Sequence, residues 1–448
     1  MPRSPADRVP LTGADCFLRA FDAEVRRRSG ASHSAQLVLR LGPGFDAVAF
    51  AKLVGEVAEA QPILRAPIRR PWGVLPPEFR LDLAVRAPLP VVEIHDAPES
   101  LAGGPPPPLF AERLNEKFDA RRGRLLRCDV VRYAGGAAGT DVAFTWLHML
   151  LDGSGSERFL RWLDEVSRGV RRASELPDEP PPSDSPKVGA RALGQQAMKW
   201  RARTRSFAAR APRSLAGPLS AARQRLEVDV TTFGADETAR IGERARKLAG
   251  FLTPMLFYLA ASVRAHRAVF ELRGIDPRSY VVPLPVNLRA KGAGGALFGT
   301  RVSLLWFQVM RESCGTLDSL LAELKAQRLA TIKDGMVEAG TAAMDYARWL
   351  PRYAYARMAR RAFGGELCSF FFGYTDEFLA GMTTFLGAPI ENGFHAPSVP
   401  PSPGSAAIFS LRAGRLNFSH VRQSGVFSGF EQVRLQRSLR ADLLGELE

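Results

Sequence analysis

Apolar and polar residues follow two kinds of pattern along the chain: one is typical of β-strands and the other of amphipathic α-helices. Residues 141–147 (DVAFTWL) carry mainly apolar side chains on both faces of an extended segment, which is typical of a strand buried between two layers. Ala47–Ala60 instead places Val48, Leu53 and Val57 on one face of a helix. The first half of the chain therefore predicts a doubly buried strand and an amphipathic helix.

The same mixture continues along the rest of the chain. In the first half, residues 36–41 predict another strand, and Ser156 is a candidate N-cap for a helix with Phe159, Leu160, Leu163 and Val166 on one face. The second half predicts helices over 236–248 and from Thr253 onward, strands over 280–286, 302–310 and 369–374, and a hairpin of 406–410 with 415–419. Intermixed helices and strands in both halves predict two α/β sandwiches side by side.

The length of 448 residues also favours two domains. The clearest break is ELPDEPPPSDSPKVG, residues 175–189, whose prolines and short polar residues cannot continue a helix or a central strand. We therefore expect an N-terminal domain over 1–174, a linker and basic helix over 175–225, and a C-terminal domain over 226–448.

Charge narrows the range of partners only in part. The 61 Lys and Arg residues exceed the 46 Asp and Glu residues, giving a net charge of +15, which attracts acidic carriers, anionic lipid, phosphorylated cofactors or nucleic acid. An Arg-, Ala-, Gly- and Pro-rich composition is also what a GC-rich genome produces. The basic stretch 187–213 predicts a helix up to about Arg210, either as a solvated face or as a docking face for lipid or a carrier protein. No aromatic-interleaved basic patch or groove-reading motif points to nucleic acid.

Two features place the protein in a compartment. No apolar run reaches the roughly 18 residues of a membrane-spanning helix, and MPRSPADRVPLTG lacks the apolar core of a signal peptide. We therefore expect a cytoplasmic protein. The cysteines, Cys16, Cys128, Cys314 and Cys368, form no CxxC pair, so neither a disulfide framework nor a zinc site is expected, and Cys128 is expected to pack as a small hydrophobic residue.

The candidate for chemistry is His148, in the segment FTWLHMLLDG. It follows a buried strand, so its side chain can face a cleft, where a neutral imidazole accepts a proton from a hydroxyl, amine or thiol near pH 7. Asp152 can hold the loop or the ring, and Gly153 permits unusual backbone geometry. The alternative is a histidine buried in the core. The other histidines, His33, His95, His266, His395 and His420, have no catalytic or metal-ligand spacing.

HMLLDG resembles the HxxxDG signature of the chloramphenicol-acetyltransferase-like superfamily, which includes condensation domains, wax ester synthase/diacylglycerol acyltransferases and polyketide-associated acyltransferases. Further segments similar to this superfamily follow in the expected order: VPLTGADCFLRAFD, QPILRAPI, FDARRGRLLR, ARKLAGFLTPMLFYLAA, VPLPVNLR and SHVRQSGVFSGFE. Condensation domains usually have two consecutive histidines, and Leu147 stands in place of the first. The usual "GN" after the PVNLR strand appears only as AGGALFGT, and no DFGWG segment occurs.

The resemblance implies two similar domains in a V, with a tunnel in which acyl donor and acceptor meet at His148. It implies that His148 is the general base and that no covalent acyl-enzyme forms. Asp152 would be mainly structural and would pair with an arginine of the second domain, for which Arg289 is the candidate because a guanidinium forks onto a carboxylate. The alternative for Arg289 is a surface residue after a strand.

We therefore expect an acyltransferase that moves an acyl group from a CoA or carrier-protein thioester to an alcohol or amine, with no permanently bound cofactor and no metal. Two alternatives stay open at this point. One is a non-catalytic module that docks an acyl carrier protein. The other is a wax ester/diacylglycerol-type enzyme lying peripherally on an anionic membrane, a reading that the basic stretch 187–213 motivates.

Overall fold

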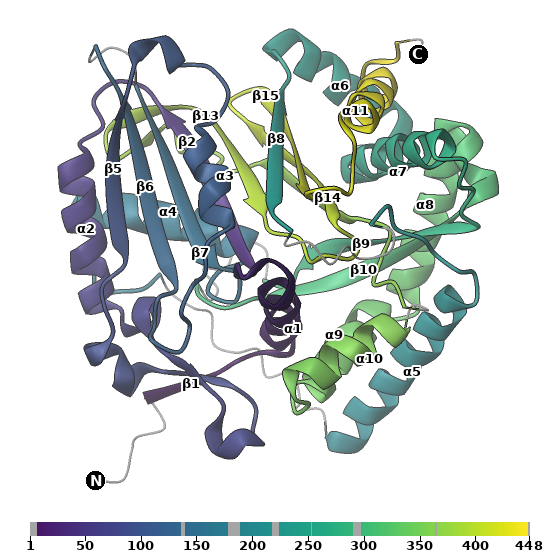
Figure 1. The fold of residues 1–448 in the computed structure, drawn as a ribbon, viewed down its shortest axis with the longest axis horizontal. Coiled ribbons are helices and arrows are strands. Elements are labelled where there is room, and N and C mark those ends of the chain that lie inside the picture. The colour runs from purple at the N-terminus through teal and green to yellow at the C-terminus, as the bar shows by residue number, and fades with distance from the viewer. Residues whose placement is uncertain are drawn as a thin grey trace.

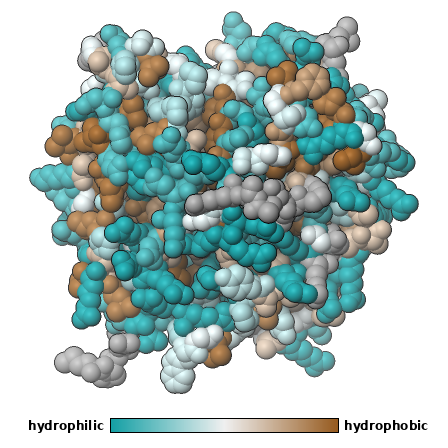
Figure 2. Space-filling view, viewed as in Figure 1, coloured by the Kyte–Doolittle hydropathy of each residue, from teal (hydrophilic) through white to brown (hydrophobic). Residues whose placement is uncertain are grey.

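The computed structural model describes residues 7–135, 139–177, 189–216, 224–251, 253–289, 297–362 and 365–446, and it is a mixed α/β structure (Figure 1). The described strands form two large sheets, a two-stranded pair and a small three-stranded sheet. The predicted α/β class is confirmed. The face shown in Figure 2 is mostly hydrophilic, with apolar residues scattered over it.

The first large sheet has six strands. Their order is β12 (Thr384–Phe385), β13 (Ala388–Pro397), β2 (Ser34–Leu41), β7 (Thr140–Leu147), β6 (Leu126–Tyr133) and β5 (Val91–Ala97). Neighbours are antiparallel except β5 and β6. Helices α2 (Ala47–Ala60) and α4 (Gly153–Ser167) cover one face, and α3 (Pro108–Leu114) packs on the other (Figure 1). Every residue of β7 is buried, because both of its faces meet a layer of side chains.

The second large sheet has the order β11 (Phe371–Glu377), β14 (Ser405–Arg412), β15 (Arg415–Gln423) and β8 (Leu226–Thr232). Beside it lies the antiparallel pair β9 (Ser279–Asn287) and β10 (Val302–Met310). The helices packed on this half are α6 (Ala235–Ala249), α7 (Pro254–Leu272), α8 (Leu317–Lys333) and α11 (Gly429–Leu444). Helix α7 is the most apolar of them because it lies between the strands and α11.

Four further helices, labelled α1, α5, α9 and α10, and strand β1 lie in the lower part of Figure 1. Helices α1 (Gly13–Ser29), α5 (Ala190–Ala208), α9 (Met336–Ala347) and α10 (Arg352–Ala362) contact one another. The small sheet has the order β1 (Arg8–Pro10), β4 (Glu78–Arg80) and β3 (Ile68–Arg69). Short 3₁₀ helices span Pro62–Arg65, Pro71–Gly73, Leu81–Arg86, Glu99–Leu101 and Arg311–Gly315.

Strand β13 joins the two halves. It comes from the second half of the sequence but pairs with β2 of the first sheet, with Phe394 opposite Val38. It also crosses the second sheet, where the amides of Asn392 and Asn417 donate to each other at 3.1 and 2.9 Å. The two sheets are therefore fastened together by a strand that both contact.

Several predicted boundaries need correction. Ser156 is not the N-cap of α4: that position is Asp152, whose carboxylate accepts from the N–H of Gly155. Thr253 precedes α7, but its hydroxyl donates to the carbonyl of Ala249 rather than capping. The basic helix ends at Ala208, two residues before its predicted end. The strand predicted over 369–374 is β11, which begins at Phe371 and ends at Glu377. Most of the predicted linker, residues 178–188, lies outside the described residues.

Other predictions are confirmed by the structure. The ranges of α2 and β10 are as predicted, and the predicted hairpin is formed by β14 and β15. Its turn residues Ala413 and Gly414 have φ values of 50° and 70°, which suits the twist of a two-residue hairpin. All four cysteines are free and buried, and Cys128 packs in the core of the first sheet. In the described part of the chain no single helix could cross a membrane; only α6 and α7 taken together, bent by 99°, pass by length and composition.

Candidate active site

His148 follows the last residue of β7 and is held by the neighbouring strand. Its backbone N–H donates to the carbonyl of His33 at 3.2 Å, just before β2 and β7 begin their ladder at Ser34 and Leu147. The chain then turns tightly, and the buried indole of Trp146 donates to the carbonyl of Leu151 at 2.8 Å. The core therefore fixes the backbone on both sides of His148.

The ring of His148 lies in an aromatic setting. It stacks on the ring of His33, with centroids 5.3 Å and planes 26° apart. His33 is buried; its Nδ1 lies 2.9 Å from the hydroxyl of Ser398, and Phe21 meets its ring edge-on at 5.6 Å. His148 as a residue is only partly buried. Its Nδ1 is enclosed and meets no hydrogen-bond partner among the described residues, so Nε2 is the nitrogen that remains for a substrate.

Burial lowers the pKa of His148 below its usual value, and its own carbonyl, the charge of Asp152 and the carbonyl of Leu151 offset part of this effect. The pKa of His33 is lowered further, by burial and by the positive charge that His148 would carry. Both imidazoles are therefore neutral near pH 7, and a neutral imidazole can accept a proton.

The carboxylate of Asp152 is hydrogen-bonded to Arg289 and to two backbone N–H groups. Nη1 of Arg289 donates to both of its oxygens, at 2.8 and 2.7 Å. One oxygen also accepts from the N–H of Gly155 at 2.7 Å, and the other from the N–H of Arg301 at 2.7 Å. The side chains of Asp152 and Arg289 are 3% and 2% exposed, so Arg289 is not a surface residue. The structure thus brings these two predicted residues together, through one nitrogen rather than the expected fork.

The segment before β10 is attached to the turn that carries His148. The N–H of Gly299 donates to the carbonyl of Leu150 at 2.8 Å, and Gly299 forms an isolated parallel bridge with Leu151. The next residue, Thr300, donates its N–H to the carboxylate of Asp15 on α1 at 2.9 Å. Residues 290–296, which include the first half of the segment AGGALFGT, lie outside the described residues. The described remainder ties α1, the His148 turn and β10 together.

The two glycines after Asp152 differ. Gly153 is the first residue of α4, and its φ is not in the left-handed region. A Cβ there would meet nothing within 4 Å, so the expected unusual backbone is not found. A Cβ on Gly155 would lie 2.8 Å from the carbonyl oxygen of Leu297 and 3.2 Å from Asp152 Oδ1. The position that requires a glycine is therefore 155, where the second half of the chain packs against α4.

Sequence reasoning missed three contributors to this site. His33 and Ser398 set the environment of the ring, and the backbone of Arg301 completes the bonding of Asp152. The one signal for His33 is its place three residues before the strand predicted to begin at Gln36. That signal becomes specific only when the pairing of β2 with β7 is known.

One group of potential metal ligands converges in the described part of the chain, away from His148 on β5 and β6. Ligand atoms of Glu93, His95 and Asp129 lie within 4.8 Å of one another. However, Arg113 donates to Asp129 at 2.9 Å and Arg127 donates to Glu93 at 3.0 Å. Two guanidinium groups already balance the two carboxylates, so the group is an ion-pair network with little attraction for a cation.

No protein-family model and no curated protein matches the chain in sequence. Solved structures of the same fold span nearly all of it. The first condensation domain of the CDA synthetase, in complex with a substrate analogue, has a TM-score of 0.70 at 15% identity and covers 98% of this chain and 96% of its own. The condensation domain of the Monacolin K polyketide synthase MokA has a TM-score of 0.63 at 17% identity, covering 98% and 97%.

An acetyltransferase has the same fold. The TRI3 trichothecene 15-O-acetyltransferase from Fusarium sporotrichioides has a TM-score of 0.69 at 14% identity and covers 99% of this chain and 96% of its own. The chain therefore has the fold of condensation domains and of an acetyltransferase, as the resemblance implied.

Proposed function

We propose that the chain is an acyltransferase that moves an acyl group from a CoA or carrier-protein thioester to the hydroxyl or amine of an acceptor. The observation that carries this proposal is the neutral imidazole of His148, a residue that is only partly buried although it follows a fully buried strand. A base must be unprotonated and reachable, and its position must be fixed by the fold.

The step needs no group beyond the two substrates and His148. Nε2 of His148 takes the proton of the acceptor as its oxygen or nitrogen attacks the thioester carbonyl. The new C–O or C–N bond forms, the C–S bond breaks, and the imidazolium returns the proton to the leaving sulfur. No acyl-enzyme is required. Burial raises the pKa of the Cys128 and Cys368 thiols well above their usual range, which argues against a cysteine nucleophile.

In this mechanism Asp152 positions the site rather than carrying a proton. Its two oxygens accept from Arg289, Gly155 and Arg301. These donors hold the carboxylate toward the second half of the chain. The carboxylate fixes the start of α4 to the segment before β10. Its charge raises the pKa of His148, but burial lowers that pKa by a larger amount.

The solved neighbours support a thioester donor. One of them, the starter condensation domain of rhizomide synthetase, was solved in complex with C8-CoA and Leu-SNAC. Another is a 15-O-acetyltransferase. Leu147 stands where condensation domains usually have a further histidine, so an ester product is as compatible with this chain as an amide.

The test is turnover of the purified protein on a panel of acyl-CoAs and acyl-pantetheine thioesters, followed by mass spectrometry of free thiol and acylated acceptor. His148→Ala and His148→Gln should lower kcat/KM by roughly 10²- to 10⁴-fold, while His95→Gln, a histidine away from the site, should not. Unchanged turnover in the His148 variants would contradict the assignment of the base. No transfer by the wild type, together with tight binding of an acyl carrier protein, would favour a docking module instead.

A further inference from the structure

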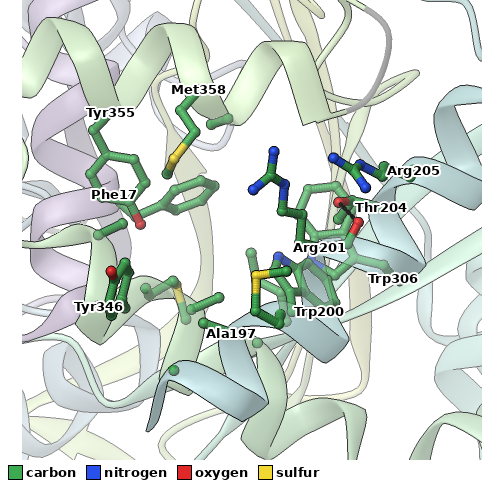
Figure 3. A pocket seen from close by; sticks show the side chains of 18 of the residues that line it. Phe17, Ala197, Trp200, Arg201, Thr204, Arg205, Trp306, Tyr346, Tyr355 and Met358 are labelled. Carbon is green, nitrogen blue, oxygen red and sulfur yellow. Dashed lines mark hydrogen bonds between the residues drawn. The ribbon is translucent and has the colours of Figure 1, made fainter. Parts of the chain in front are cut away.

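A cavity of about 1120 Å³ lies between helices α1, α5, α9 and α10 and strand β10 (Figure 3). Its volume is that of a site for a sizeable small molecule. The described residues that form its walls include neither His148 nor His33, and neither Asp152 nor Arg289. The cavity is therefore a feature of the fold that the proposed acyl transfer does not use.

Packed rings close the cavity on the side of His148. Phe17 on α1 lines it, and the ring of Phe17 lies 4.5 Å from that of Phe21. Phe21 meets the ring of His33 edge-on at 5.6 Å, and both of these residues are buried. A molecule in the cavity therefore contacts neither the candidate base nor the ring stacked on it, and it lies outside the reach that general base catalysis requires.

The walls are mainly aromatic and aliphatic. In Figure 3, Phe17, Tyr346 and Tyr355 lie on one side of the opening, and Trp200 and Trp306 lie on the other. The rings of the two tryptophans are 6.0 Å apart. Such flat, rigid surfaces bind a broad apolar body at little cost in side-chain entropy.

Large apolar side chains are exposed to water around the cavity. Met198 on α5 is 57% exposed, Tyr346 on α9 is 60% exposed, and Met358 on α10 is 44% exposed. All three line the cavity. Methionine side chains are flexible and adapt to irregular apolar partners. Exposed apolar side chains gathered around a hollow are typical of a ligand-binding groove.

Arginines complete the lining: Arg191, Arg201, Arg205 and Arg357. The guanidinium groups of Arg201 and Arg205 lie on the same side of the cavity (Figure 3). Among the described lining residues there is no aspartate or glutamate, and within the part of the chain that the structure describes none of the four arginines takes part in an ion pair. Four cations beside an apolar space attract a ligand that carries an anionic group.

The lining disfavours ligands with many polar groups. Besides the arginines and the aromatic residues, the described lining has polar side chains only at Gln195 and Thr204, and the Thr204 hydroxyl donates to the carbonyl of Arg201 at 3.0 Å. A sugar or a nucleoside would lose hydrogen bonds to water here without replacing them, which costs binding free energy. The chemistry of the walls therefore favours an apolar body with a single anionic group.

We propose that this cavity is a second ligand site, separate from the site of acyl transfer, and that its ligand is a free anionic amphiphile: an apolar body that carries one carboxylate, sulfonate or phosphate. The apolar body lies between the tryptophans and the ring of Phe17, and the anionic group lies at Arg201 and Arg205. The ligand is bound but not acylated, because the packed rings keep it from His148. Such binding does not depend on acyl transfer being the reaction of the protein.

Binding can be measured without turnover, by the fluorescence of 8-anilinonaphthalene-1-sulfonate and of its uncharged counterpart N-phenyl-1-naphthylamine. Dodecanoate, which has no hydroxyl or amine to acylate, should displace both. We expect Arg201→Gln/Arg205→Gln to weaken binding of the sulfonate at least about tenfold and to change binding of the uncharged amine little. Arg437→Gln, on an exposed position of α11, is the matched charge control. Equal affinity of the double variant and the wild type for the sulfonate would overturn the proposal.

Further measurements separate this site from catalysis. His148→Ala should bind the sulfonate like the wild type, saturating CoA should not displace it, and the arginine double variant should keep the wild-type KM for both substrates of acyl transfer. Loss of binding in His148→Ala, displacement by CoA, or a rise of either KM by about tenfold would assign the cavity to the substrates and overturn the proposal. Failure to detect acyl transfer would contradict the proposed function alone, since the binding measurements need no turnover.

Blocking variants test the location. Ala343→Trp on α9 and Ala197→Phe on α5 each place bulk in the cavity. Either variant that melts like the wild type should lose binding of the sulfonate and of the uncharged amine alike, and retained binding would count against the site. Vesicles containing phosphatidylglycerol provide the other source of anionic amphiphile: sedimentation with them that depends on Arg201 and Arg205, without binding of the sulfonate or dodecanoate in solution, would also overturn the proposal.

Discussion

The imidazole of His33 stacks on that of His148 at a centroid distance of 5.3 Å. His33 is itself fixed, because Ser398 lies 2.9 Å from its Nδ1 and Asp22 accepts its backbone N–H at 3.0 Å. A positive charge on His148 would lower the pKa of His33 further, beyond the effect of burial. The stack therefore favours a neutral pair and orients the ring of the candidate base.

Removal of this stack is the first prediction. His33→Ala should lower kcat by up to about 100-fold, because a small displacement of a reacting group has effects of this size, with a smaller change in KM. His33→Phe, which restores a flat ring, should recover most of the loss. The acid limb of the kcat/KM profile should lie below pH 6.5 in the wild type, where burial lowers the pKa of His148, and should move upward in His33→Ala as water enters. Identical rates and profiles in all three proteins would contradict the positioning role.

The pair of Asp152 and Arg289 predicts a strong coupling. Asp152→Asn or Arg289→Gln alone leaves a buried charge without its partner, for which the loss of unfolding free energy is typically about 3–5 kcal/mol. The double variant Asp152→Asn/Arg289→Gln should lose less than the sum of the two single losses. Urea unfolding of the four proteins measures this difference. Additive losses would mean that the two side chains do not stabilise each other.

Two neighbouring glycines provide a matched test of the packing between α4 and the second half. Gly155→Ala should lower the unfolding free energy by about 1–3 kcal/mol, because the new methyl group would lie 2.8 Å from the carbonyl oxygen of Leu297. Gly153→Ala has open space, so its stability should equal or slightly exceed that of the wild type. Thermal melts compare the two variants directly, and the reverse order of stability would be inconsistent with the structure.

Buried histidines predict a loss of stability in mild acid. Four histidines lie in the core of the protein. Burial lowers the pKa of His266 and His395 to about 4, and it lowers the pKa of His33 and His420 well below the usual range. The unfolded chain takes up protons near pH 6.5 and the native chain does not, so stability is highest above that pH and falls as the pH drops toward 4. Each histidine contributes a slope of up to about 1.4 kcal/mol per pH unit.

Urea midpoints at pH 7.0 and 5.5 measure this slope. His395→Gln, which cannot titrate, should reduce it by about one proton. Asp15 and Glu157 act in the opposite direction, because burial raises their pKa values and the native carboxyl groups bind protons first. Stability that rises on acidification would therefore show that the carboxyl groups outweigh the histidines.

Local patterns were enough to predict most of the elements. The apolar faces of residues 141–147 predict the doubly buried strand correctly, and the helix over Ala47–Ala60 is confirmed, with Leu53 and Val57 on its buried face; Val48, predicted on the same face, is exposed. Capping was harder. Asp152 serves both as the N-cap of α4 and as the partner of Arg289, so assigning it to the loop alone moved the predicted cap to Ser156.

Contacts between distant segments could not be predicted from these patterns. His33 reaches His148 only because Ser34 pairs with Leu147, and this register depends on the whole sheet. The arginine partner of Asp152 was predicted by resemblance to known proteins, not by periodicity. The cavity has walls from α1, α5, α9, α10 and β10, and no single one of these segments carries a pattern that identifies a binding site.

The place of β13 has a consequence for how the protein is made. Strand β2 emerges from the ribosome well before its neighbour in the finished sheet, Ala388–Pro397, which lies more than 340 residues further along the chain. Until then β2 presents an unpaired edge, which is a template for pairing with other chains. A chain truncated before residue 388 is therefore expected to aggregate rather than to fold as a smaller protein.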